Sequence, residues 1–301
     1  MSLPNFVVIG AGKSGTTSLH YYLKQHPEIY LTTIKELNFF AVEGNKLEFS
    51  GPKDDLEAKN YFSINSLDQY KKLFEEVRTE KAVGDISPFY IYSEQAPKRI
   101  KAHIPQTKII AILRNPIDRA YSNYLHLLRD GREPLQSFEE ALHAEEERIQ
   151  HNWSPSWHYA HAGLYYQLLK RYYDLFNSDQ IHIFLYEDYV QDPIRTLKCI
   201  YELLDVDSDF LPDLSSRHNA SGIPKNQILH NLLSSQSPIR NLAVNTLPKS
   251  VVGKIASFRD RNLDKPAPMT STTREALTSY YKEDILKLQD LLQLDVSRWL
   301  R

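Results

Sequence analysis

Residues 6–24, FVVIGAGKSGTTSLHYYLK, carry the clearest indication of fold in this sequence. The first five residues of this stretch form an apolar run that is typical of a strand buried on both faces of a parallel sheet. A glycine-rich turn follows, after which Leu19, Tyr22 and Leu23 recur at helical spacing. The order strand, glycine turn, helix leaves backbone N–H groups unpaired at the positive end of the helix dipole. The stretch therefore predicts a site for an anion, usually a phosphate.

The same alternation of strand and helix continues along the chain. Further strands are expected over 29–32, 81–85, 108–114 and 181–186, with amphipathic helical stripes between them. Such alternation requires right-handed crossovers and a parallel sheet that is covered by helices on both faces. We therefore predict a single α/β domain over residues 1–301, three-layered and P-loop-like, with a central parallel sheet of about five strands.

Composition limits the partners of the chain. A net charge of −2 over 301 residues gives no reason to expect nucleic acid or an acidic membrane surface, so any anion must be held by local basic groups. No apolar run approaches the roughly 20 residues that a membrane span needs. The N-terminus lacks a signal-peptide pattern, which points to a cytoplasmic protein or to a domain cut from a longer polypeptide. The single cysteine, Cys199, lies in an apolar helical pattern and is expected to be buried.

One candidate for the glycine turn is the Walker A loop of nucleotide hydrolases and kinases. That motif needs a glycine five positions before the Gly-Lys pair, but Val7 stands there relative to Gly12 and Lys13. A nucleotide hydrolase also favours an acidic residue at a strand end for Mg²⁺, whereas the fourth expected strand ends in Arg114. The spacing argues against a Walker A loop.

A second candidate is the dinucleotide-binding fingerprint. Gly10, Gly12 and Gly15 fit G-x-G-x-x-G, and Glu36 lies about 20 residues further on, as that motif requires. The fingerprint has no use for a lysine inside the turn, however, and it leaves the arginine after the fourth strand unexplained. On the glycine pattern alone this interpretation stays open.

Three stretches in order carry a family resemblance: KSGTTSL (13–19), HPEIYLTTIKELNFF (26–40) and ILRNPIDRAYSNY (112–124). The chain resembles the sulfotransferases that use 3′-phosphoadenosine 5′-phosphosulfate (PAPS). The nearest group contains the heparan sulfate sulfotransferases and their bacterial relatives, including sulfotransferase domains of polyketide and olefin synthases. The resemblance covers most of the chain and continues through GDISPFY (84–90) and LYEDYVQDP (185–193). It implies a transferase that moves a sulfuryl group from PAPS to a hydroxyl or amine and releases 3′-phosphoadenosine 5′-phosphate (PAP).

The resemblance also implies that one nucleotide is held at two anion sites. Lys13 would contact the 5′-phosphate and the bridging oxygen. The rest of the first site would be Gly12, Ser14, Gly15, Thr16, Thr17 and Ser18. Arg114 and Ser122 would hold the 3′-phosphate, since their spacing matches the family motif. Arg217 and Lys225, in SSRHNASGIPKN (215–226), lie where relatives keep a basic loop over the nucleotide.

For the transfer step, the resemblance assigns Lys13 to the leaving oxygen and Glu36 to the removal of the acceptor proton. His158 and His161 are alternative bases. Because parallel strands end at one rim, Lys13, Glu36 and Arg114 are expected to converge there. A blander interpretation of Glu36 is a surface glutamate paired with a neighbouring lysine. The scheme requires no metal, and the sequence shows no His, Cys and Asp cluster at ligand spacing.

The acceptor is left open by the sequence. Candidates are a glycan, a small alcohol, and a β-hydroxyacyl chain on a carrier protein. Asp85, Ser87 and Tyr90 follow the third strand and are expected at the same rim, in contact with acceptor or nucleotide, or else in a simple Ser-Pro turn. Two probable insertions, 41–66 and 226–262, are expected to shape the acceptor site. The rival functions are a P-loop nucleoside or nucleotide kinase-like enzyme and a non-catalytic nucleotide-binding protein on the same fold.

Overall fold

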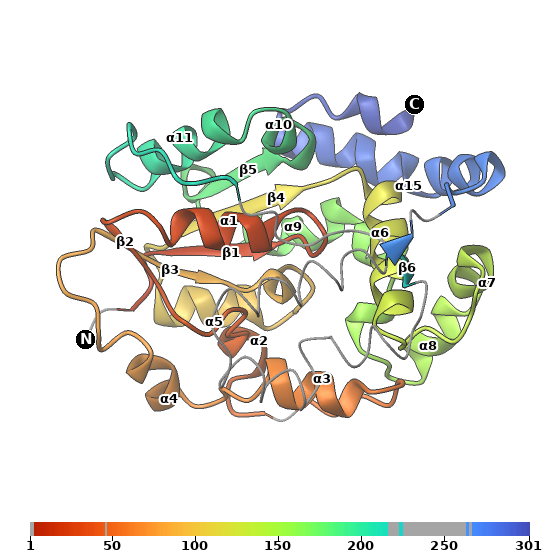
Figure 1. The fold of residues 1–301 in the computed structure, drawn as a ribbon, viewed down its shortest axis with the longest axis horizontal. Coiled ribbons are helices and arrows are strands. Elements are labelled where there is room, and N and C mark those ends of the chain that lie inside the picture. The colour runs from red at the N-terminus through yellow and green to blue at the C-terminus, as the bar shows by residue number, and fades with distance from the viewer. Residues whose placement is uncertain (1–2, 46, 216–222, 225–262, 265–266) are drawn as a thin grey trace.

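The fold is built on a five-stranded parallel sheet with the order β2-β3-β1-β4-β5 (Figure 1). The computed structural model describes residues 3–45, 47–215, 223–224, 263–264 and 267–301. The strands of this sheet are β1 Phe6–Gly10, β2 Ile29–Leu31, β3 Ala82–Ile86, β4 Lys108–Leu113 and β5 Ile181–Leu185. A short antiparallel pair is formed by β6 Ile223–Pro224 and β7 Leu263–Asp264.

Alternating side chains of the sheet enter two separate cores. Val7 and Ile9 of β1 belong to the larger core, and Phe6 and Val8 belong to the smaller one on the other face. Every residue of β1 is buried, as expected for the middle strand of a sheet covered on both faces. The sheet and its two helical layers give the three-layer arrangement.

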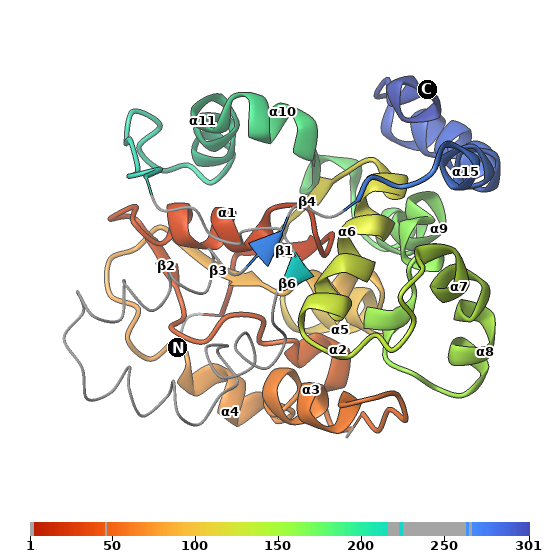
Figure 2. The same cartoon turned by 45° about the vertical axis from the view of Figure 1, so that its right-hand side comes forward.

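The helices divide between these two cores. The smaller core is covered by α1 Thr16–Leu23, α10 Tyr186–Gln191 and α11 Pro193–Leu203. The larger core is covered by α2 Phe39–Val42, α3 Asp54–Tyr61, α4 Leu67–Lys72, α5 Ala96–His103, α6 Pro116–Arg129, α7 Phe138–His143, α9 Tyr165–Tyr173 and α15 Ser271–Leu292. The short helix α8 Glu145–Gln150 follows α7. Figure 2 shows α15 beside α9 at the edge of the molecule, where the two helices are in contact.

The predicted α/β fold and all five predicted strands are confirmed. Helix α3 lies inside the segment 41–66, which the sequence analysis treated as an insertion. Helices α7 and α8 follow one another and are separated at Ala144. The prediction that Cys199 is buried is wrong: the residue is exposed, because α11 buries the stripe that contains Leu197 and Ile200 instead. The segment 226–262 lies outside the described residues.

The strand order places a topological switch point between β1 and β4. After β1 the chain crosses by way of α1 to β2 at one edge of the sheet. After β4 it crosses by way of α6 and α9 to β5 at the opposite edge. Adjacent strands whose connections diverge form a topological switch point, where ligands of open α/β sheets bind. Within the described residues, no helix is both long enough and apolar enough to cross a membrane.

Candidate functional site

The turn between β1 and α1 requires glycine at position 15. Gly15 has a φ of 84°, in the left-handed region that side chains rarely adopt. A Cβ atom on Gly15 would also lie 3.0 Å from the Tyr189 ring. The turn is fixed further by Gly12, whose backbone N–H donates to the Tyr92 hydroxyl over 3.2 Å. These constraints hold Lys13, itself at a φ of 70°, within the turn.

Several polar groups of this turn have no partner within the described part of the chain. The first turn of α1 has neither an acidic residue nor a side-chain cap. The backbone N–H groups of Thr16, Thr17 and Ser18 donate to no described group. The Ser14 hydroxyl is fully buried and also unpartnered. Since buried polar groups are normally hydrogen-bonded, this arrangement fits an anion that accepts from the turn.

Lys13 has a strongly lowered side-chain pKa. Burial, followed by the positive charge of Arg129, lowers the pKa of Lys13 from its usual 10.5 to about 7. Arg114 lowers this pKa further, while Asp130 and Glu36 raise it. The Lys13 ammonium forms no ion pair with any described residue. An ammonium destabilised in this way is stabilised by a bound anion.

Arg114 lies directly after β4 and reaches the same turn. Its Nη1 donates to the Lys13 carbonyl oxygen over 3.1 Å, and its guanidinium stacks on the Tyr186 ring with 4.8 Å to the centroid. Like Lys13, it forms no ion pair with a described carboxylate. The predicted convergence of Lys13 and Arg114 is therefore present in the structure.

Ser122 lies about two turns into α6, the helix that starts just after Arg114. The start of this helix is well defined: Asn115 caps it by accepting from the Ile117 N–H over 2.9 Å, with Pro116 at the first position. Ser122 is half-buried, and its hydroxyl makes no hydrogen bond to a described residue. Its role in holding a phosphate stays a prediction.

Glu36 lies in the turn after β2 with a left-handed φ of 60°. Lys35 donates both to the Glu36 carboxylate and to the Thr17 hydroxyl, the latter over 2.8 Å. The pairing with a neighbouring lysine is thus present, and it joins Glu36 to the first turn of α1. Because the charge of Glu36 also raises the pKa of Lys13, the two groups share one electrostatic environment.

The sequence analysis missed a cluster at the end of α6. Arg129 Nη2 donates to His126 Nδ1 over 2.6 Å, and Arg129 Nε donates to Asp130 over 3.1 Å. Burial, and then the charge of Lys13, hold the pKa of His126 well below its usual 6.5. Since an arginine only donates, the neutral imidazole carries its proton on Nε2. His126 is therefore a further hydrogen-bond donor near Lys13, and a helix stripe alone did not reveal it.

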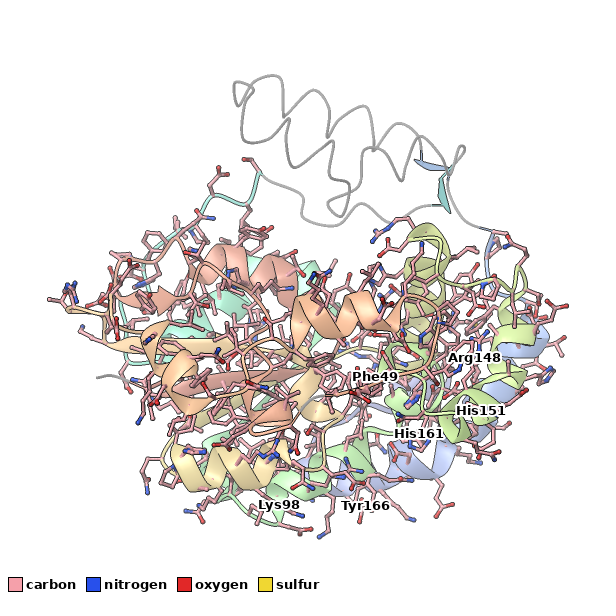
Figure 3. All side chains as sticks on the ribbon, turned by 90° about the horizontal axis from the view of Figure 1, so that it is seen from below. Phe49, Lys98, Arg148, His151, His161 and Tyr166 are labelled. Atoms are coloured by element: carbon pink, nitrogen blue, oxygen red, sulfur yellow. The ribbon has the colours of Figure 1, made fainter. Side chains whose placement is uncertain are left out.

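The two alternative bases are not brought to the turn. His161 is exposed, and its backbone N–H donates to the Glu145 carboxylate over 2.7 Å. Figure 3 shows it on the side of the molecule that carries Arg148 and His151. Burial lowers the pKa of His158 to about 4, and its ring packs edge-on against that of His161. No described contact joins either histidine to Lys13, so their assignment as bases stays a prediction without support from the geometry.

For Asp85, Ser87 and Tyr90 the structure favours the structural alternative over contact with a ligand. All three side chains are buried, and both Ser87 and Tyr90 donate to the Asp85 carboxylate. Parallel strands do end at one rim, but these side chains point inward. Arg217 and Lys225 lie outside the described residues. Among the described residues, no three His, Cys, Asp or Glu side chains are grouped to hold a metal ion.

Comparisons with known proteins agree with this geometry. A family model described as the sulfotransferase family matches residues 4–210. A solved sulfotransferase from Alicyclobacillus acidocaldarius is 34% identical, with all of both chains covered and a TM-score of 0.77. The membrane-associated sulfotransferase kil1 of Dictyostelium discoideum is 34% identical over 50% of this chain. The bifunctional heparan sulfate N-deacetylase/N-sulfotransferase 4 of Mus musculus is 27% identical over 99% of it. The chain spans 30% and 31% of the length of these two relatives.

Proposed function

We propose that this chain, which belongs to the sulfotransferase family, transfers a sulfuryl group from PAPS to a hydroxyl or amine acceptor. One observation carries the proposal: Lys13 and Arg114, two cations that pair with no carboxylate of the described residues, meet at the switch point of the sheet. PAPS has a phosphosulfate at one end and a separate 3′-phosphate, so it needs two anion sites. The Walker A spacing fails in this turn, and the family match favours a sulfotransferase over a nucleotide kinase.

The residues of the chain suit an in-line displacement at sulfur. Glu36 accepts the proton of the acceptor O–H or N–H as its oxygen or nitrogen bonds to sulfur. The bond between sulfur and the bridging oxygen breaks, and its electron pair stays on the 5′-phosphate of PAP. Lys13 and the amides of the turn stabilise this leaving phosphate. Arg114 and Ser122 hold the 3′-phosphate and thereby orient the nucleotide.

For the acceptor we propose a glycan that offers a hydroxyl or amine, supported by the similarity to a heparan sulfate N-sulfotransferase. Segments 41–66 and 226–262 are proposed to shape its site. A small alcohol and a carrier-bound β-hydroxyacyl chain stay alternative acceptors, and a cytoplasmic location stays a prediction. The test is a screen with sulfur-labelled PAPS against N-desulfated heparin, a panel of small alcohols and a 3-hydroxyacyl carrier protein. Label in any of these products supports transfer; label in none contradicts the proposed function.

Arg114→Met is expected to weaken PAP binding about 10- to 100-fold, because a charge-assisted bond to a phosphate contributes roughly 1.5–3 kcal/mol. Binding of AMP, which lacks the 3′-phosphate, should change by less than about threefold. Isothermal titration calorimetry with both nucleotides measures the difference. Arg195→Met, at an exposed position of α11, is the control. Equal losses for PAP and AMP would remove the role assigned to Arg114.

PAP binding is also expected to weaken as the pH rises from about 7 to 9, by up to tenfold per pH unit. The pKa of Lys13 is about 7 in the unbound protein, so above this pH the lysine must take up a proton to pair with phosphate. Below pH 7 it is already charged. Calorimetry at pH 8 in two buffers with different ionisation enthalpies should detect this proton uptake. A pH-independent affinity from 7 to 9 would show that Lys13 does not pair with the ligand.

A further inference from the structure

A buried hydrogen-bond network lies behind the turn that carries Glu36. The Asp85 carboxylate at the end of β3 accepts from the hydroxyls of Ser87 over 2.6 Å, Tyr90 over 2.6 Å and Tyr70 over 2.9 Å. Each of these four side chains is at most 1% exposed. Because the Ser87 hydroxyl proton is committed to Asp85, the lone pairs of its oxygen point to another donor.

That donor belongs to the turn after β2. The backbone N–H of Asn38 donates to the Ser87 hydroxyl over 3.0 Å, inside the protein. Two further bonds hold the same segment. The side-chain amide of Asn38 donates to the Tyr61 carbonyl oxygen over 3.0 Å, and the backbone N–H of Phe40 donates to the Tyr90 hydroxyl over 3.4 Å. The segment is therefore attached to the end of β3 through Ser87 and Tyr90.

This turn needs support from outside. Glu36 and Asn38 both have left-handed backbone conformations, with φ values of 60° and 52°. Each such residue other than glycine is strained, and the conformation persists only where the surrounding structure holds it. The bond from Asn38 to Ser87 lies two residues from Glu36 and fixes the backbone there.

We infer that Ser87, oriented by Asp85, is a positioning residue for Glu36: it holds the turn that presents this carboxylate towards Lys13. The inference rests on the proposed function, since it concerns the group that accepts the acceptor proton. Ser87 itself touches neither substrate. Its loss should therefore reduce the rate of transfer and leave nucleotide binding intact, because a small misplacement of a catalytic group costs rate.

The test compares Ser87→Ala with Tyr70→Phe. Both variants remove one hydroxyl from the same buried carboxylate, but only Ser87→Ala removes the acceptor of the Asn38 N–H. With labelled PAPS and the best acceptor of the screen, Ser87→Ala is expected to lower kcat roughly 10- to 100-fold. The KM for PAPS and the Kd for PAP should stay within about twofold. Tyr70→Phe should keep kcat within about threefold, and urea denaturation measures the stability lost by each variant.

An unchanged kcat in Ser87→Ala would overturn the inference, as would an equal loss in Tyr70→Phe, which would mark a general structural effect. Hydrogen–deuterium exchange gives a readout without an acceptor: the peptide over residues 36–41 should exchange faster in Ser87→Ala and at the wild-type rate in Tyr70→Phe. Wild-type protein that transfers to no acceptor would contradict the proposed function instead. The exchange result would then still decide whether Ser87 holds this turn.

Discussion

Replacing Lys13 with methionine is expected to lower sulfuryl transfer about 1,000-fold, the upper range for loss of one preorganised group that stabilises developing charge. The ammonium stands in the turn between β1 and α1 with no carboxylate partner among the described residues. Methionine keeps much of the length and packing of the side chain but cannot neutralise a leaving phosphate. Turnover of labelled PAPS by purified protein measures the effect.

The same substitution is expected to stabilise the unbound protein. Burial first, and then Arg129, lower the pKa of Lys13 in the folded state to about 7, against the usual value of 10.5. Folding below pH 7 therefore carries the full cost of enclosing this charge, and the cost disappears as the pH rises towards 10.5. Lys13→Met should melt a few degrees higher than wild type near neutral pH, with a difference that shrinks at higher pH.

Lys24→Met is the matched control for both effects, since Lys24 is the C-cap of α1 and its Nζ donates to the Thr32 carbonyl oxygen over 3.4 Å. It should keep wild-type turnover. A Lys13→Met protein with more than a tenth of the wild-type rate would show that the leaving phosphate is stabilised elsewhere. A lower melting temperature would show that the lysine stabilises the fold, contrary to its electrostatic surroundings.

Glu36→Gln is expected to lower turnover by about 10²- to 10⁴-fold, the usual contribution of a positioned general base. The amide keeps the size of the side chain and can still bond within the turn, but it cannot accept the proton of the acceptor. Because Glu36 is assigned to the acceptor and not to the nucleotide, the Kd for PAP should change by less than about threefold. Rapid-quench turnover and calorimetry on the same protein separate the two effects.

Glu76→Gln, at an exposed position, controls for the loss of a negative charge. A Glu36→Gln protein with near wild-type turnover would refute the assignment of the base. His158 and His161, the alternative bases of the sequence analysis, would then be the next groups to test. A large loss of PAP binding would instead place Glu36 in the nucleotide site, through Lys35, which donates to both Glu36 and Thr17.

The sheet could be predicted from the sequence because its strands are short, continuous apolar runs. Such runs are typical of strands buried on both faces, and each expected strand forms where its run lies. The meeting of Lys13 with Arg114 could also be predicted, since both follow strands of one parallel sheet. The rule that parallel strands end at one rim was sufficient here, because a backbone carbonyl of the turn accepts a hydrogen bond from Arg114.

The remainder of the site depends on contacts between distant segments. Asp85 was expected at the rim, yet its side chain is buried. Its carboxylate accepts hydrogen bonds from the hydroxyls of Tyr70 and Tyr90, which lie within the core. Strand position alone does not show which way a side chain points. The neutral state of His126 depends likewise on burial and on the charge of Lys13, which is distant from it in the sequence. Periodicity placed this residue on a helix and gave no reason to single it out.

We propose that the turn after β1 and the arginine after β4 bind one nucleotide together. A crystal structure of the protein with PAP bound tests it most directly. We predict the 5′-phosphate at Lys13 and the N-terminal amides of α1, with the 3′-phosphate in contact with Arg114 and Ser122. Phosphates bound elsewhere, or Lys13 and Arg114 facing separate clefts in that complex, would contradict it.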